Sequence, residues 1–338
     1  MRFFSDNTGT VCPEILAALA DANHGLEPAY GNDSWTRRLD ECLSAYFEAP
    51  VRAFPVATGT AANSLSIATL SPSYGVIFAH EEAHIANDEC GAPGFFSGGA
   101  QISCLQGPDG KVTPAALAAA LDAHPVSLHT TQPTVLALSQ ATELGTSYRP
   151  EELTALATLA HDRGLKVQLD GARFANSVAF LNCHPGDITW RAGVDVLSFG
   201  ATKNGALTAE AVVFFNPEAV RDFELRRKQS GHLLSKSRYA SAQLLAYVES
   251  GVWLRNAQRA NALAQRVAQA AGALLMHPVE ANEIFLALGQ ERKRALRQAG
   301  FEFYDWNAAS SGQARFVISW EQSEEDVLAL CGALEKLR

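Results

Sequence analysis

The chain has 338 residues, 47% of them hydrophobic, with 36 acidic against 27 basic residues and a formal net charge of −9 at pH 7. This length is enough for about two globular domains, and the acidic excess argues against nucleic acid or an anionic membrane as the main partner. The apolar run at the N-terminus, Phe3-Phe4, is too short for a signal peptide, and no run reaches membrane-spanning length.

Six cysteines are scattered along the chain without a Cys-x-x-Cys pair. This spacing indicates neither a zinc site nor a disulfide framework, and a reducing compartment fits it best. We therefore expect a cytoplasmic protein and assign no metal-ligating residues.

In chain order, the hydrophobic spacing predicts an irregular arm over residues 1–12 and a short helix over 13–22. A second helix, capped within 32–34, carries Leu39, Leu43 and Phe47 at helical spacing. A strand over 54–57 and a helix over 61–70 follow. We expect these elements to form the first part of a large domain.

The turn between that strand and helix reads Thr58-Gly59-Thr60. Because free backbone N–H groups and the helix dipole point at such a turn, it is a candidate phosphate site. Capping of the helix by Thr58 or Thr60 explains the same pattern equally well.

Strands and helices continue to alternate up to the middle of the chain. The predicted strands are 76–79, 135–138, 166–169, 194–198 and 211–215, and the predicted helix is 151–163. Val- and Leu-rich strands that alternate with helices indicate a largely parallel sheet covered on both faces.

From about residue 239 the pattern changes. The expected elements are a long helical region over 239–276, short extended segments at 284–286, 301–303 and 315–318, a helix over 291–298 and a last helix from 324. We therefore predict an arm and a large α/β domain over 1–245, and a smaller α+β domain over 246–338.

Three candidate functional groups lie where predicted strands end. Lys203 follows the strand 194–198 in a glycine-bounded turn, where a confined amine loses its proton readily and can form a Schiff base. Asp170 and Arg173 follow the strand 166–169, where a carboxylate would hold a heterocyclic nitrogen protonated. Taken alone, the lysine is more often a surface residue, and the other two form a loop ion pair equally well.

Each of two further residues can be interpreted either as a functional residue or as an ordinary structural or surface residue. His84 follows another strand and is placed to lie against a ring or to relay a proton, although a lone histidine is more often structural. Arg315 begins a late strand and is suited to bind a carboxylate with its forked guanidinium, although such an arginine is usually a surface group.

The order of these groups along the chain is typical of pyridoxal-phosphate enzymes of the aspartate aminotransferase fold type (fold type I). More closely, the chain resembles the threonine aldolase family, the low-specificity L-threonine and phenylserine aldolases of the β-eliminating lyase group. The resemblance covers nearly the whole chain. It rests on Ser5–Thr10, Ala29–Asp33, Thr58–Asn63, Ala83–His84, Leu169–Arg173 and Thr202–Gly205.

This resemblance implies pyridoxal 5′-phosphate as cofactor and fold type I, with a mainly parallel sheet between helices and a smaller C-terminal domain. It also implies a homo-oligomer, a dimer or tetramer with sites between subunits. Lys203 would form the Schiff base with the cofactor, Asp170 would pair with its pyridine nitrogen, and His84 would stack on its ring.

The remaining contacts are also implied by the resemblance. They are Arg173 and Thr202 near the cofactor, Gly59 and Thr60 at its phosphate, Lys228 or Lys236 reaching the same phosphate, Ser5 and Arg315 at the substrate carboxylate, and Tyr30 at the substrate site, where it would serve a neighbouring subunit.

One departure from the family concerns the base. Many relatives carry a histidine after the strand that corresponds to 135–138, whereas here the segment reads Gln140–Gly145 and Glu143 takes the place of that histidine. Glu143, His84 or a water between them is the hypothesised acceptor of the β-hydroxyl proton, since a carboxylate with a raised pKa acts near neutral pH. The other interpretation is that Glu143 only orders its loop.

The predicted activity is that of a carbon–carbon lyase. It is retro-aldol cleavage of L-threonine or L-allo-threonine to glycine and acetaldehyde, with phenylserine-type substrates as a further expectation. Alternatives are β-elimination or amino transfer on the same scaffold, or a binding protein that kept the fold without catalysis. A nucleotide-dependent enzyme is disfavoured, because neither a Gly-x-Gly-x-x-Gly turn after a strand nor a Gly-Lys-Ser/Thr loop is present.

Overall fold

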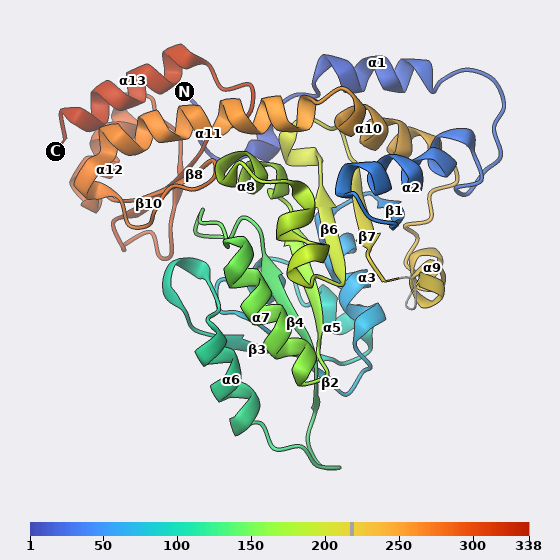
Figure 1. Ribbon diagram of the computed structural model, residues 1–338. Helices are drawn as coiled ribbons and strands as arrows, with labels where there is room; N and C mark the ends of the chain where they lie inside the picture. The colour runs from blue at the N-terminus through green and yellow to red at the C-terminus, as the bar shows by residue number, and fades with distance from the viewer. Residues whose placement is uncertain (217–219, 338) are drawn as a thin grey trace.

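A seven-stranded sheet forms the centre of the molecule in the computed structural model, which describes residues 1–216 and 220–337 (Figure 1). In order across the sheet, the strands are β1 (Arg52–Val56), β7 (Glu210–Phe214), β6 (Val196–Gly200), β5 (Lys166–Gly171), β4 (Gln132–Ser139), β2 (Gly75–His80) and β3 (Gln101–Leu105). Strand β7 runs antiparallel to both of its neighbours, and the other pairs are parallel. The expected mainly parallel sheet is confirmed.

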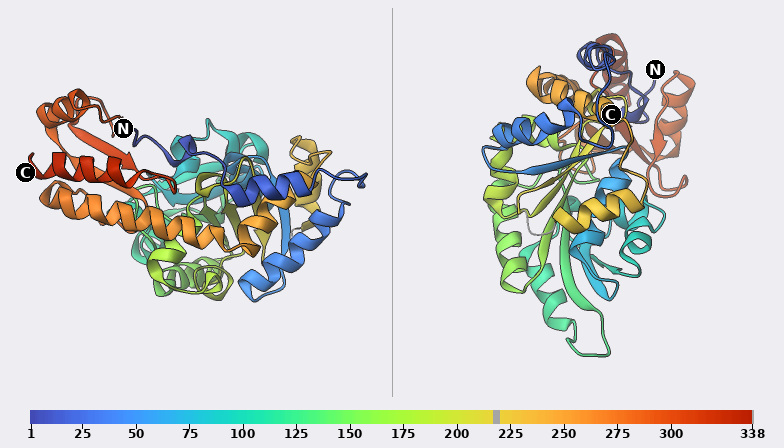
Figure 2. Two further views of the ribbon diagram at one scale, coloured as in Figure 1. Left: turned by 90° about the horizontal axis from the view of Figure 1, so that it is seen from above. Right: turned by 90° about the vertical axis from the view of Figure 1, so that its right-hand side faces the viewer.

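Helices cover both faces of this sheet (Figure 2). One face carries α3 (Gly59–Leu70), against which α5 (Ala92–Ser97) and α9 (Val220–Gln229) pack. The other carries α2 (Ser34–Phe47), α7 (Pro150–Asp162), α8 (Phe174–Leu181) and α10 (Arg238–Glu249). Because β2, β6 and β7 are buried at every residue, their sequences are apolar runs without alternation.

A second sheet lies beside the first, with the antiparallel order β8 (Glu283–Ala287), β10 (Gln313–Val317) and β9 (Tyr304–Asp305). The helices α12 (Gly289–Gln298) and α13 (Glu324–Glu335) belong to this part of the chain. The long helix α11 (Val252–Ala271) contacts α8 of the large unit as well as α13 and β8, and spans both units in Figure 1. A separate hydrophobic cluster, which joins Phe3 to apolar residues between 263 and 334, fills this unit.

The N-terminal arm is bound to the small unit and then enters the large one. The backbone N–H of Phe3 donates to the carbonyl of Glu302 at 2.8 Å, and its carbonyl accepts from Val317 at 2.9 Å. A short 3₁₀ turn, η1 (Asp6–Thr8), and the helix α1 (Pro13–Asp21) follow. The arm therefore joins the two units.

Three expectations need correction or addition. The predicted helical region 239–276 is broken into α10 and α11 at Gly251, whose φ of 72° is left-handed. The segment 301–303 is no strand but an isolated bridge from Glu302 to the arm. The edge strand β3 and the helices α4 (His84–Asn87), α5 and α6 (Pro114–Ala123) were not predicted.

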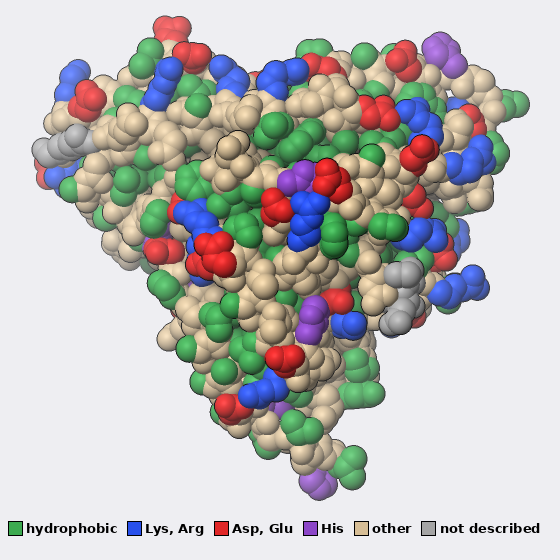
Figure 3. All heavy atoms as spheres, viewed as in Figure 1, with side chains coloured by type: hydrophobic (Ala, Val, Ile, Leu, Met, Phe, Trp, Pro, Cys, Tyr) green, Lys and Arg blue, Asp and Glu red, His purple; other side chains and the backbone are tan. Residues whose placement is uncertain are grey.

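The surface shows mixed charge on the face drawn in Figure 3, where acidic and basic side chains are interspersed. None of the helices in the described part of the chain combines the length and the apolar character needed to cross a membrane.

Candidate active site

A pocket of about 370 Å³ lies where several strands of the large sheet end. Its walls come from the segments after β1, β4, β5 and β6, from the first residue of β7, and from α4 and the arm. Open α/β sheets bind ligands at this edge. Eight of the predicted site residues line it: Gly59, Thr60, His84, Glu143, Asp170, Arg173, Thr202 and Lys203.

The predicted phosphate turn begins α3. The Thr58 hydroxyl accepts a hydrogen bond from the Ala61 N–H at 3.2 Å, so Thr58 is the helix cap. The N–H groups of the first turn of a helix have no partner within the helix. A Cβ added at Gly59 would meet no atom within 4 Å, so there is room for a ligand beside the backbone. Capping by Thr58 and space for an anion therefore coexist.

Asp170 lies at the end of β5 and is 7% exposed. Its carboxylate accepts hydrogen bonds from Asn63 Nδ2 at 2.6 Å and from the Ala172 N–H at 2.9 Å. Arg173 instead pairs with Asp6, so the interpretation of Asp170 and Arg173 as a loop ion pair is wrong. The Asp170 carboxylate thus stays available to a group in the pocket.

His84 is held from behind by a buried carboxylate. Its Nδ1 lies 2.9 Å from Oε1 of Glu89, which also accepts from Asn63 Nδ2 at 2.8 Å. The hydrogen bond to Glu89 raises the pKa of His84, although partial burial opposes the shift and the Asp170 charge adds to it. Glu89 and Asn63 therefore connect His84 to Asp170.

Glu143 adjoins His84 at the end of β4. Its Oε1 accepts from the Ser139 hydroxyl at 2.7 Å and from the His84 N–H at 2.8 Å, while its buried Oε2 has no partner in the described part of the chain. Burial, with the nearby charge of Asp170, raises the pKa of Glu143 to about 7. This carboxyl group can therefore take up and release a proton near neutral pH.

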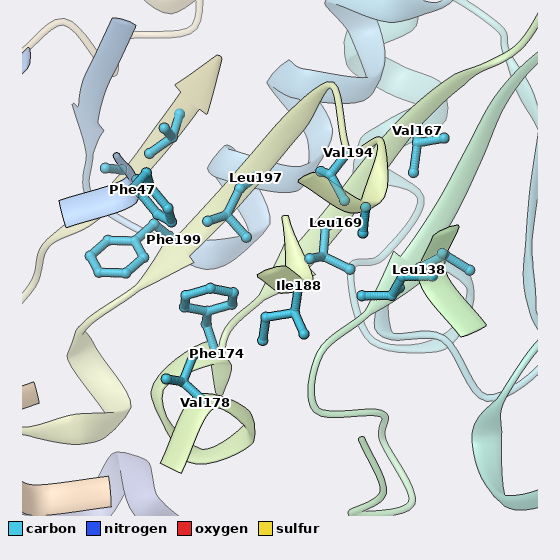
Figure 4. Packing of buried hydrophobic residues seen from close by; sticks show 14 of the residues in the cluster. Phe47, Leu138, Val167, Leu169, Phe174, Val178, Ile188, Val194, Leu197 and Phe199 are labelled. Carbon is cyan, nitrogen blue, oxygen red and sulfur yellow. The ribbon is translucent and has the colours of Figure 1, made fainter. Parts of the chain in front are cut away.

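Lys203 sits in a short 3₁₀ turn, η5 (Thr202–Asn204), directly after β6. The amide of Asn204 anchors the turn by donating to the Tyr247 hydroxyl and to the Trp253 carbonyl, both at 2.7 Å. Beneath the turn, Phe199 packs against neighbouring aromatic rings, including Phe174, as Figure 4 shows. The lysine is thus presented by a rigid support.

Arg173 is nearly enclosed by carboxylates. Its Nε and Nη2 donate to both oxygens of Asp6 at 2.8 and 3.0 Å, and its Nη1 lies 3.0 Å from Glu283. Burial alone would raise the pKa of Asp6, but the charges of Arg173 and Lys203 outweigh it and hold that pKa at about 2. The arm is therefore fixed to the pocket wall by a buried ion pair.

Arg315 and Ser5 lie outside the residues that line the pocket. Nη1 of Arg315 is 3.8 Å from Oε1 of Glu283, and its guanidinium lies over the rings of Tyr304 and Trp306 at 5.6 and 5.7 Å. The Ser5 hydroxyl accepts from the Asn7 N–H at 3.2 Å. It is Asn7 of the arm that lines the pocket.

Tyr30, Lys228 and Lys236 also lie outside the pocket lining. The Lys228 ammonium is 4.6 Å from the centre of the exposed Tyr30 ring, and Lys236 is exposed. From the basic stretch 226–236, it is His232 that reaches the phosphate turn, because its Nδ1 accepts from the Ala57 N–H at 3.5 Å.

Five residues that shape the site were not singled out from the sequence: Asp6, Asn63, Glu89, Glu210 and Glu283. Asp6 and Asn63 lie inside segments that carry the family resemblance, and this was an available signal. The sequence offers no such signal for Glu89, Glu210 and Glu283, because their partners come from other elements.

Comparisons with known proteins identify the family and the fold of the chain. The family model described as beta-eliminating lyase matches residues 2–290. A low specificity L-threonine aldolase of Pseudomonas sp. is 45% identical over 97% of this chain and 95% of its own. The threonine aldolase structure of Leishmania major has a TM-score of 0.90 at 25% identity and covers 99% of both chains. A Sphingomonas wittichii serine palmitoyltransferase shares the fold, with a TM-score of 0.73 at 17% identity over 100% of this chain and 86% of its own.

Proposed function

The chain belongs to the β-eliminating lyase family and, within it, to the threonine aldolases, and we propose that it cleaves L-threonine and L-allo-threonine to glycine and acetaldehyde. It is a carbon–carbon lyase, and its cofactor is pyridoxal 5′-phosphate. The observation that carries the proposal is that Lys203, Asp170, His84 and Glu143 line one pocket with a phosphate-type turn.

The residues present fit this cofactor. The open space at Gly59 admits a phosphate at the α3 N-terminus, and Asp170 has no cationic side chain paired with it among the described ion pairs. Lys203 provides the only lysine amine among the pocket-lining residues. When bound, pyridoxal phosphate supplies an electron sink for the charge left at Cα.

The protein's own groups divide the remaining work. Asp170 would keep the pyridine nitrogen protonated, because an adjacent carboxylate favours the charged form. His84, fixed by Glu89, would lie against the ring. Thr202 and Thr60 would contribute hydroxyl groups around the cofactor.

Glu143 is the proposed acceptor of the β-hydroxyl proton. Its Oε2 has no partner in the described chain, and its pKa of about 7 allows the ionised form at neutral pH. The N–H of His84 and the hydroxyl of Ser139 hold the other oxygen, so the carboxylate is oriented. Removal of that proton lets the hydroxyl oxygen form the aldehyde carbonyl as the Cα–Cβ bond breaks.

The substrate carboxylate is proposed to bind near Arg173 and Arg315, with Ser5 or Asn7 of the arm donating to it. Arg173 lines the pocket, and Glu283 links the two arginines at 3.0 and 3.8 Å. Asp6 and Glu283 offset the charges of the two arginines. The buried Nε of Arg315, which has no hydrogen-bond partner in the described part of the chain, remains as a donor for an anionic substrate group.

The assembly proposed is a homo-oligomer, a dimer or homotetramer with sites between subunits. Tyr30 and Lys228 contact each other at the surface and lie outside this chain's pocket, which supports a role at a neighbour's site. We also propose a domain division into 1–245 and 246–338, supported by the separate hydrophobic clusters. A cytoplasmic location is proposed from the six free cysteines.

The test is a visible spectrum of the purified protein, followed by addition of L-threonine with acetaldehyde, glycine, ammonia and keto acid quantified together. A cofactor band that is absent in Lys203→Ala, with acetaldehyde and glycine in equal amounts, is the expected result. Ammonia and a keto acid would mean β-elimination, and a lasting absence of the band with added cofactor would contradict the assignment of Lys203.

A further inference from the structure

Glu210 is a buried carboxyl group to which the proposed reaction gives no role. It is 8% exposed and lines the pocket. A carboxyl group buried in a pocket that must accept a phosphate needs a physical account, since like charges in a confined site repel each other.

The strand register places Glu210 between the two halves of the cofactor site. Its Cα pairs with that of Val56 in β1 and with that of Gly200 in β6. Val56 leads into the turn Thr58–Thr60, and Gly200 leads into the lysine turn. Because β7 starts at this point and runs back into the sheet, Glu210 sits at the edge where both turns leave.

The side chain of Glu210 belongs to the sheet face that α3 covers. In a strand, alternate residues share a face, and Val212 and Phe214 pack in one cluster with Ala61 and Ala62 of α3. Glu210 is the next residue of that row. It therefore lies on the side from which the N-terminus of α3 presents its N–H groups.

Uncharged groups donate hydrogen bonds to the Glu210 carboxyl group, which forms no ion pair with any residue that the structure describes. Its Oε2 accepts from the Ala201 N–H at 3.1 Å, and the Thr202 hydroxyl also donates to the carboxyl group. The charges of Lys203, in the turn that follows β6, and of Glu210 interact, and Glu210 also interacts with Tyr247 of α10. His232 accepts from the Ala57 N–H, next to Val56, the β1 residue that pairs with Glu210. Burial raises the pKa of Glu210 to about 7, although these hydrogen bonds and the charge of Lys203 oppose the shift.

The cations of the pocket do not compensate a second negative charge. Besides His84, the pocket-lining cations are Lys203 and Arg173, and Arg173 is matched by Asp6 and Glu283. The phosphate itself brings a charge of about −1.5 to −2 near neutral pH. An ionised Glu210 would therefore face it with little screening.

We propose that Glu210 is protonated when the cofactor is bound, and that ionisation of Glu210 weakens the hold of this site on the cofactor phosphate. The affinity for the phosphate group then falls as the pH rises through the neutral range. This inference rests on the cofactor of the proposed function and is independent of the substrate.

The test compares two ligands of the apoprotein, pyridoxal 5′-phosphate and pyridoxal, by equilibrium dialysis between about pH 6 and about pH 8.5. Both react with Lys203 through the same aldehyde, so the ratio of their affinities isolates the phosphate group. Between about pH 6 and about pH 8.5 this ratio should fall roughly 30-fold in the wild type relative to the ratio in Glu210→Gln, because the protonated fraction of Glu210 in the apoprotein falls by about that factor. The ionisation of the phosphate contributes equally to both proteins.

Glu143→Gln is the matched control. Glu143 lines the same pocket and shares a pKa of about 7, but it follows β4, three strands away from β7. The ratio of the two affinities in Glu143→Gln should change with pH as it does in the wild type. The same pH dependence of this ratio in the wild type and in Glu210→Gln would overturn the inference.

Two further outcomes are separable. If pyridoxal 5′-phosphate binds no more tightly than pyridoxal at any pH, the cofactor assignment of the proposed function fails first. If circular dichroism shows that Glu210→Gln does not fold, binding to the wild type is measured instead by calorimetry in two buffers, which gives the number of protons taken up on binding. Greater proton uptake above pH 7 with pyridoxal 5′-phosphate than with pyridoxal then supports the inference, and equal uptake overturns it.

Discussion

Oε1 of Glu89 lies 2.9 Å from Nδ1 of His84, and the Glu89 side chain is completely buried while that of His84 is 37% exposed. A buried carboxylate behind an accessible imidazole fixes the ring orientation and favours its charged form. The relationship makes Glu89 a positioning residue for His84.

Replacing Glu89 with Gln should therefore lower the pKa of His84. The amide still accepts a hydrogen bond but no longer carries a charge. Titration of labelled histidine by NMR measures the pKa directly. Ser64→Ala is the control, because it removes only the 3.3 Å hydrogen bond to the other Glu89 oxygen and should leave the pKa of His84 nearly unchanged. An unchanged value in Glu89→Gln would refute the relationship.

Glu143→Gln should reduce kcat for L-threonine by about 10²–10⁴-fold, the usual contribution of a general base, while the cofactor band remains. Glu143 must be ionised to accept a proton, so wild-type turnover should fall as the pH drops below about 7. That limb should be missing from the residual rate of the variant. Full turnover in Glu143→Gln, with none in His84→Ala, would show that Glu143 only orders its loop.

Ser139→Ala provides the graded version of this test. The Ser139 hydroxyl donates to Glu143 and lowers the pKa of its carboxyl group. Without that donor the pKa should rise, so the acid limb of kcat should move to higher pH with the maximal rate largely kept. Movement of the limb to lower pH would contradict the assignment of the limb to Glu143.

Asp6→Asn should destabilise the fold by about 2–3 kcal/mol, since it leaves the buried Arg173 with Glu283 as its remaining carboxylate. The pKa of Asp6 in the folded protein is about 2, below the ordinary aspartate value of 3.8. Its contribution is therefore present above pH 3.8 and is lost as the pH falls through 2. Urea unfolding at several pH values measures both effects. Asp222→Asn, in an exposed pair with Arg226, should cost less than about 1 kcal/mol.

Gly200→Ala should disrupt the support of the lysine turn. A Cβ there would lie 2.7 Å from both Cα and the carbonyl oxygen of Ala172, which are backbone atoms that cannot rotate away. We expect a loss of about 1–3 kcal/mol in unfolding free energy and a weakened cofactor band. Gly332→Ala, in α13 with no atom within 4 Å of the added carbon, should instead stabilise by about 0.5–1 kcal/mol. Equal effects of the two variants would exclude the steric account.

Most of the large sheet was predictable because its central strands are buried on both faces and read as apolar runs. Strand β3 escaped prediction because it is an edge strand with mostly partly exposed or exposed residues. The order of the strands could not be predicted from local sequence patterns, because β1 pairs with β7 rather than with its neighbours in the sequence. The helix break at Gly251 depends on one glycine inside an otherwise helical stretch.

The candidate site was predictable where a residue follows a strand or begins a helix. Lys203, Asp170 and the turn at Gly59 have such positions, and all three line the pocket. Asp6 has its role only because the fold brings it to Arg173, 167 residues away in the sequence. The surface placement of Tyr30 and Lys228 was likewise set by tertiary structure rather than by local spacing.

The pairing of β1 with β7 also governs how the site comes into being during synthesis. The Thr208 hydroxyl just ahead of β7 donates to the Ala57 carbonyl just after β1, and the two residues are 151 positions apart. At about 5–20 residues per second, β1 waits roughly 8–30 s on the ribosome before its partner strand is made. Until then the phosphate turn has no sheet neighbour, and the lysine turn, Thr202–Asn204, is translated only just before β7. A nascent chain therefore cannot retain its cofactor before the strand that separates these turns has been translated.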